Sequence, residues 1–133
     1  MLITKRCTFS ASHRLGRPGK GDTENLREFG KCANPYGHGH NYILEVTLEG
    51  ETTPERGYFL NFDRLGEIIE KEVIGLLDHK CLHEEIPFFR DHPATCENIA
   101  FFIWKNLKGK FKECHLFRIL LKETENNFVE YYG

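Results

Sequence analysis

The stretch HGHNYILEVTLEG, residues 38–50, decides the fold because its side chains alternate at the two-residue period of a strand. Its even positions from 42 onward are apolar: Tyr42, Leu44, Val46 and Leu48. Its odd positions from 45 onward are polar: Glu45, Thr47 and Glu49. A strand with one apolar and one polar face is typical of an antiparallel sheet that packs on a core and faces water on its other side.

Upstream of this strand, residues 2–13 predict a second one. Its apolar side chains share the odd positions: Ile3, Cys7, Phe9 and Ala11. If the two strands form a hairpin, His13 at the end of the first lies beside His38 at the start of the second. The segment between them, residues 16–37, is rich in Gly, Pro, Asp, Asn and charge, and we expect a long loop there.

Downstream, the spacing of apolar residues predicts two helices. The first begins after the N-cap Asp63 and runs to about Leu77. The second begins after the N-cap Thr95 and stops near Gly109. Residues 116–123 and 128–132 then predict two more strands joined by a turn.

The order strand, strand, helix, helix, strand, strand predicts one α+β domain over residues 1–133, with two antiparallel hairpins flanking two helices. Four strands leave two open sheet edges. We therefore expect the edges to be covered by oligomerisation, or by closing a barrel between subunits.

Composition excludes several classes of function. The chain has 18 Lys and Arg against 20 Asp and Glu, so its net charge of −2 does not fit a nucleic-acid binder or a membrane-surface protein. No apolar run approaches a membrane span, and the residues after Met1 lack the pattern of a signal peptide. Five scattered cysteines without a CxxC pair indicate neither a disulfide framework nor a zinc finger. We expect a cytoplasmic protein.

A histidine pair supplies the first candidate site. His38 and His40 lie two residues apart on one strand, so both imidazoles face the same side. His13 would join them through the hairpin. Three histidines without a fourth protein ligand are typical of a catalytic zinc site that leaves one position for water or substrate. The alternative is a set of polar side chains on a wet face. Three further histidines lie in polar contexts and predict no site: His83, His92 and His115.

A cysteine near this strand is the candidate nucleophile or general base. Cys32 lies six residues before His38, and the adjacent Lys31 favours the thiolate. The flanking residues are typical of a loop, although a single cysteine can also be a buried hydrophobe.

Two carboxylates and a threonine complete the candidates. Asp78 next to His79 can orient the imidazole in a proton relay, or simply end the first helix. Glu123, at the end of a strand, can accept two N–H bonds from a planar ring edge, or be a solvated charge. Thr95 has an adequate explanation as a helix cap.

In combination, these residues resemble the 6-pyruvoyl-tetrahydropterin synthase family. The matching segments are residues 9–15, 24–26, 29–32, 34–35, 37–42 and 77–80, then Thr95, 97–98, 123–124 and 126–127. The resemblance implies the tunnelling fold, or T-fold, with three subunits closing a barrel, two trimers stacking into a homohexamer, and active sites between subunits. It implies zinc ligation by His13, His38 and His40.

The resemblance also implies a reaction. Dihydroneopterin triphosphate is converted to 6-pyruvoyl-tetrahydropterin with loss of triphosphate, as in tetrahydrobiopterin biosynthesis, with zinc as Lewis acid and template. Cys32 would accept the carbon-bound proton, Asp78 and His79 would relay protons, and Glu123 would anchor the pterin, with Thr95 also contacting the substrate. From their charge, Lys31 and Arg14 are candidates for the triphosphate.

Three alternative hypotheses for the function remain. A related class makes 6-carboxy-tetrahydropterin and has three residues between its cysteine and the HxH pair, whereas this chain has five, residues 33–37. A further subclass has a glutamate in place of Cys32. A departure from the family pattern is Cys96, where we expect Thr or Ala. A different class altogether is a zinc-stabilised pterin-binding module without catalysis, which the presence of the whole relay disfavours.

Overall fold

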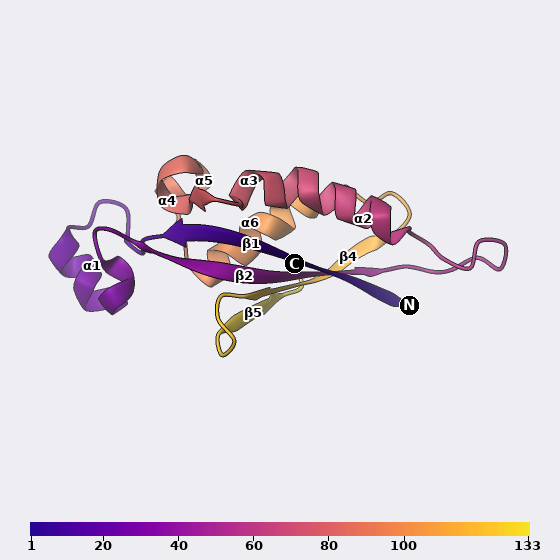
Figure 1. The fold of residues 1–133 in the computed structure, drawn as a ribbon, viewed down its shortest axis with the longest axis horizontal. Helices are drawn as coiled ribbons and strands as arrows, with labels where there is room; N and C mark the ends of the chain where they lie inside the picture. The colour runs from indigo at the N-terminus through magenta and orange to yellow at the C-terminus, as the bar shows by residue number, and fades with distance from the viewer.

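The computed structural model describes residues 1–133 as a five-stranded sheet covered on one face by helices (Figure 1). The strands are β1 (Leu2–His13), β2 (His38–Glu49), β3 (Lys80–Cys81), β4 (His115–Lys122) and β5 (Phe128–Tyr131). The helices are α1 (Asp22–Phe29), α2 (Phe62–Ile69), α3 (Gly75–Leu77), α4 (Leu82–Glu85), α5 (Phe88–Asp91) and α6 (Cys96–Leu107). The α+β prediction is confirmed.

The sheet has the order β3-β1-β2-β4-β5. β1 and β2 pair antiparallel over their whole length, from Leu2 opposite Glu49 to His13 opposite His38. β4 pairs antiparallel with both β2 and β5, so the two predicted hairpins join into one sheet. β3 pairs parallel with β1 and makes the sheet mixed.

The core lies between this sheet and the helices α2, α3 and α6, which Figure 1 shows on the same side of it. Phe9 and Tyr42 are opposite each other on β1 and β2, and their rings stack with centroids 4.9 Å apart. The apolar rows predicted for these strands point into the core, where α2 and α6 contribute fully buried Leu65, Ile69, Ile99 and Ile103. Each such side chain contributes about 1.5–3 kcal/mol through its burial.

The first long helix begins two residues earlier than the sequence predicted. The cap is Asn61, whose Oδ1 accepts a hydrogen bond from the backbone N–H of Asp63 at 2.6 Å. Asp63 therefore lies in the first turn, where its negative charge interacts favourably with the helix dipole. The helix continues through a π-helical turn (Glu70–Ile74) into α3 and ends at Leu77, as predicted. None of the helices combines the length and apolar character that a membrane span requires.

The prediction of a loop over residues 16–37 is wrong in part. The segment contains α1 and a 3₁₀ turn (Gly30–Ala33), and Figure 1 shows α1 apart from the other helices at the end of the β1–β2 hairpin. Asn25 of α1 is buried, its Oδ1 accepting from the N–H of Arg17 and its Nδ2 donating to the carbonyl of Lys20. Polar contacts rather than an apolar stripe hold α1, so apolar periodicity could not reveal it.

The sequence analysis also missed β3, α4 and α5, which occupy residues 80–91 between the two long helices. β3 has two residues and each of these helices has four, too short for a periodic pattern. The second predicted helix is α6, and its cap is confirmed because Thr95 Oγ1 accepts from the N–H of Asn98 at 3.3 Å.

Candidate metal centre and active site

Three histidines meet at the end of the β1–β2 hairpin where residues 14–37 connect the two strands. His13 and His38 are the last opposed pair of the ladder, and His40 is opposite Ala11 on the same face. The Nε2 atoms of His13 and His38 lie 3.0 Å apart, and one nitrogen from each of the three rings lies within 4.8 Å of the others. The cluster that the sequence predicted therefore forms.

The chain enters β2 through a glycine that the geometry requires. Gly37 has φ +67°, and a Cβ at this position would lie 2.9 Å from the carbonyl oxygen of His13. A side chain here would separate the two strand ends that carry His13 and His38.

A backbone carbonyl fixes the tautomer of His13. Its Nδ1 donates to the carbonyl oxygen of Ala94 at 2.6 Å, which leaves the Nε2 lone pair aimed at the other histidines. The ring is 1% exposed, and burial lowers the pKa of His13 to about 4, with His38 and His40 adding to the shift. His13 is therefore neutral at neutral pH, the form that binds metals.

The spacing and hydrogen bonding of the three histidines fit a bound divalent ion better than an empty cluster. His40 Nε2 is buried without a hydrogen-bond partner, and an orphaned buried nitrogen of this kind costs about 1–3 kcal/mol. Three imidazole nitrogens around zinc at about 2.0–2.1 Å would lie roughly 3.4 Å from one another in a tetrahedral arrangement. The observed separations bracket this value, and the three rings would hold zinc or another divalent ion that imidazole suits.

Glu123 lies against the same nitrogens. Its Oε1 is 3.5 Å from His13 Nε2 and 3.6 Å from His40 Nε2. Burial lowers the pKa of His40, and the Glu123 carboxylate opposes that shift. Glu123 follows β4 directly, and continuing the β2–β4 register places it opposite Tyr42, which explains its position.

An open groove of about 450 Å³ joins Glu123 to the candidate cysteine. Its lining includes Leu15, Cys32, Thr95, Cys96 and Glu123. The N–H of Leu15 donates to the carbonyl oxygen of Cys32 at 2.8 Å, and this bond ties the cysteine turn to the segment that follows His13. The structure therefore brings together the metal cluster, Cys32, Thr95 and Glu123.

Cys96, which departs from the family pattern, is a second thiol in this groove. Its Sγ donates to the carbonyl oxygen of Leu121 at 3.6 Å. Burial raises the pKa of Cys96 to about 12, and the charges of Glu123 and Glu97 act in the same direction. This thiol therefore stays protonated and unreactive, unlike a catalytic thiolate.

The Asp78–His79 pair lies elsewhere. Asp78 Oδ2 accepts from His79 Nδ1 at 2.8 Å, and Asp78 Oδ1 accepts from the N–H of Ser10 at 2.9 Å. These bonds, first the one from Ser10, lower the pKa of Asp78. His79 has φ +58°, a backbone conformation that costs a residue other than glycine about 1–3 kcal/mol.

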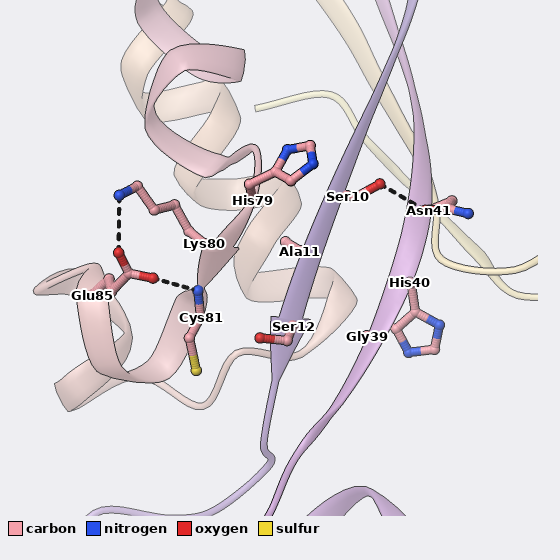
Figure 2. A pocket seen from close by; sticks show the side chains of 10 residues that line it. All are labelled: Ser10, Ala11, Ser12, Gly39, His40, Asn41, His79, Lys80, Cys81 and Glu85. Atoms are coloured by element: carbon pink, nitrogen blue, oxygen red, sulfur yellow. Dashed lines mark hydrogen bonds and ion pairs between the residues drawn. The ribbon is translucent and has the colours of Figure 1, made fainter.

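His79 faces a second open hollow of about 500 Å³, lined also by Ser10 and Asn41 (Figure 2). Ser10 and Asn41 form a cross-strand pair one step from Ala11 and His40, so their side chains point to the opposite face of the sheet from the metal cluster. Within one chain, the pair is on the far side of β1 and β2 from the cysteine groove. The relay and the three-histidine cluster of one chain therefore lie toward opposite faces of the sheet, although His40 of β2 also borders this hollow.

These features define an α+β protein whose sheet carries three histidines that could hold a metal ion, next to a carboxylate that borders a groove with a thiol. The family model described as "6-pyruvoyl tetrahydropterin synthase" matches residues 2–133, and the chain belongs to this family.

Individual relatives agree with this assignment. The 6-pyruvoyl tetrahydrobiopterin synthase of Homo sapiens is 44% identical over 131 residues, which cover 98% of this chain and 90% of that protein. The structure of Caenorhabditis elegans 6-pyruvoyl tetrahydropterin synthase, 33% identical, superposes with a TM-score of 0.92 over 100% of this chain and 95% of that one. The 6-carboxy-5,6,7,8-tetrahydropterin synthase of Rickettsia bellii is 29% identical over 96% of each chain. The chain is thus more similar to the biopterin type, as the cysteine spacing predicted.

Removing one imidazole tests the metal centre. We expect His40→Ala to weaken zinc binding by more than about 100-fold, because loss of a group that only hydrogen-bonds to a ligand already costs about 10–100-fold. Equilibrium dialysis with elemental analysis gives the zinc bound per chain. The matched control is His115→Ala, a change at an exposed histidine on the first residue of β4. Equal zinc binding by the two variants would exclude the triad as the site.

Proposed function

We propose that this chain converts 7,8-dihydroneopterin triphosphate to 6-pyruvoyl-5,6,7,8-tetrahydropterin and triphosphate. The observation that carries the proposal is that Cys32 and Glu123 line one groove and that Glu123 also lies against His13 and His40 of the three-histidine cluster, in a member of this family. The side chain loses triphosphate and two hydrogens while the ring gains two, so no redox cofactor is consumed.

Glu123 is the proposed anchor for the pterin. Its carboxylate is about one-fifth exposed, and it can accept two parallel N–H bonds from the ring edge. Such a bidentate contact would fix the ring while the substrate's side chain extends toward the histidines. Thr95, already bonded to the N–H of Asn98, lies in the same lining and is proposed to border the ring.

Cys32 is the proposed base. A metal ion held by the three histidines would supply Lewis acidity that makes the carbon-bound hydrogens of the substrate side chain more acidic. Cys32 lines the same groove as Glu123, which lies against the histidines, and as a thiolate it would accept such a proton. The thiol of Cys96 stays protonated and cannot take this role.

The relay is proposed to come from a neighbouring subunit. His79 is 82% exposed on the sheet face opposite the metal cluster, so a second chain must bring it to a groove. The sheet offers the means, since β5 has a free outer edge and β3 covers only Ala11 and Ser12 of β1. Head-to-tail pairing of such edges closes a ring. We propose that residues 1–133 act as one domain in a barrel of three subunits, stacked in pairs into a hexamer.

Catalysis is tested with zinc-loaded protein and dihydroneopterin triphosphate. We expect 6-pyruvoyl-tetrahydropterin, identified by mass spectrometry after reductive trapping, and a loss of at least about 100-fold in kcat for Cys32→Ala with zinc retained. The matched control is Cys7→Ala on the core-facing side of β1, remote from the groove. A carboxy-tetrahydropterin product with acetaldehyde would instead assign the chain to the carboxy class. Full turnover by Cys32→Ala would refute the role of this thiol.

The shared site is tested by mixing two inactive variants. If Cys32 and His79 of one site come from different chains, random mixed oligomers of Cys32→Ala and His79→Ala regain about a quarter of wild-type activity, because one site in four receives both intact residues. Each variant alone and a mixture that is not allowed to exchange subunits are the controls. Mixed oligomers without activity would show that both residues act from one chain.

A further inference from the structure

A third hollow, which we call the basic hollow, is bordered by Arg14, the residue after His13, and by Ala94. It has a volume of about 190 Å³, and its polar lining consists of Arg14, Arg17, Asn25, His83 and Arg90. No acidic side chain lines it, although the chain as a whole carries a net charge of −2. Three guanidinium groups surround this small space; Arg14 pairs with Asp22 and Arg17 with Glu28, so the uncompensated positive charge is that of Arg90.

The basic hollow and the cysteine groove share a wall. Arg14 and Gly16 line the basic hollow, whereas Leu15 between them lines the groove that contains Cys32. Ala94 also lines the basic hollow, and its carbonyl oxygen accepts from Nδ1 of His13. An anion in the basic hollow would therefore lie next to the backbone that holds a metal ligand.

Two of the lining groups are held in place by the backbone. Arg14 is 24% exposed, and its Nε donates to the carbonyl oxygen of Ala33 at 3.1 Å. The N–H of Arg14 donates to Nδ1 of His83 at 3.1 Å, so the ring proton of His83 lies on Nε2. Burial lowers the pKa of His83, which keeps this ring neutral, and its Nε2 lies 3.5 Å from Oε1 of Glu84, so an anion would compete with this exposed carboxylate for the ring N–H.

The other two arginines, Arg17 and Arg90, have positive charges that are weakly paired or unpaired and can bind an anion. Arg17 pairs with Glu28 at 2.7 Å, but both side chains are about half exposed, and pairs of this kind contribute little. Arg90 has no carboxylate partner within ion-pair distance. Its Nη2 reaches only the carbonyl oxygen of Glu84, at 3.4 Å. Among the three arginines of the hollow, Arg90 is therefore the one free to bind an anion.

We propose that the basic hollow binds a phosphate group, with Arg90 as its principal charged contact and Arg14, Arg17 and His83 as supporting donors. Guanidinium groups match phosphate oxygens in a bidentate geometry, which favours phosphate over chloride, and several donors around one space suit the larger number of oxygens on a phosphate. The phosphate has two sources: the triphosphate tail of the substrate, which rests on the proposed function, or free inorganic phosphates. Arg14 was a triphosphate candidate from its charge alone, whereas Lys31 does not line the hollow.

Calorimetry with inorganic tripolyphosphate tests the site without any turnover. We expect the zinc-loaded protein to bind it, and Arg90→Ala to weaken binding at least about tenfold, with partial recovery in Arg90→Lys. The matched control is Arg64→Ala on α2, a 63% exposed arginine paired with Glu67. All these variants keep the three histidines, so any direct binding of tripolyphosphate to zinc is common to them. Equal affinity for wild type and Arg90→Ala would overturn the proposal.

Kinetics then separates the two sources. If the substrate's tail occupies the basic hollow, Arg90→Ala raises KM for the triphosphate substrate at least about tenfold and leaves kcat nearly unchanged, because the contact is remote from the reacting carbons. An unchanged KM together with weaker tripolyphosphate binding would assign the hollow to free phosphates. A wild-type protein without turnover would refute the proposed function, whereas the calorimetric result would still decide the site.

Discussion

The register of the β1–β2 hairpin is the constraint on which the rest of the structure depends. Twelve opposed pairs run from Leu2 and Glu49 to His13 and His38. A slip of one residue would turn every side chain of one strand to the other face, separating His13 from His38 and exposing the apolar row. The core therefore fixes the register and, through it, the metal ligands. The stacked pair of Phe9 and Tyr42 lies in the core on the same sheet face as the histidines, two residues along each strand from Ala11 and His40, and so links the core to the cluster.

The three-histidine cluster is built from groups that are unfavourable without an ion. His13 is buried and neutral, its Nε2 lies 3.0 Å from that of His38, and His40 Nε2 has no partner. A bound cation would relieve all three at once, so metal binding and folding stability are linked. The carbonyl of Ala94 adds the outer contact that fixes the tautomer of His13, and the same residue borders the basic hollow. The two sites thus share one short segment before α6.

The sequence predicted the elements whose side chains alternate or repeat over many residues. The two long strands, the two long helices and the pairing of His13 with His38 follow from periodicity and are confirmed. The helix α1, held by polar contacts, and the two-residue strand β3 carry no such signal.

Two arrangements around the site depend on tertiary packing that spacing alone does not encode. The family resemblance selected Asp78 and His79, but only the structure shows that they face away from the metal cluster. The basic hollow joins residues 14–25 to residues 83–94, segments that meet only in the fold.

X-ray absorption at the zinc edge of the metal-loaded protein tests the central claim, that this register creates a metal centre. We expect three imidazole nitrogens at about 2.0–2.1 Å, with the multiple-scattering signature of histidine rings and no sulfur in the first shell. A first shell with fewer than two imidazoles, or with a zinc–sulfur distance of about 2.3 Å, would contradict the account. A zinc–sulfur distance would mean that Cys32 or another thiol is a ligand. Either result would show that the hairpin does not by itself make the site.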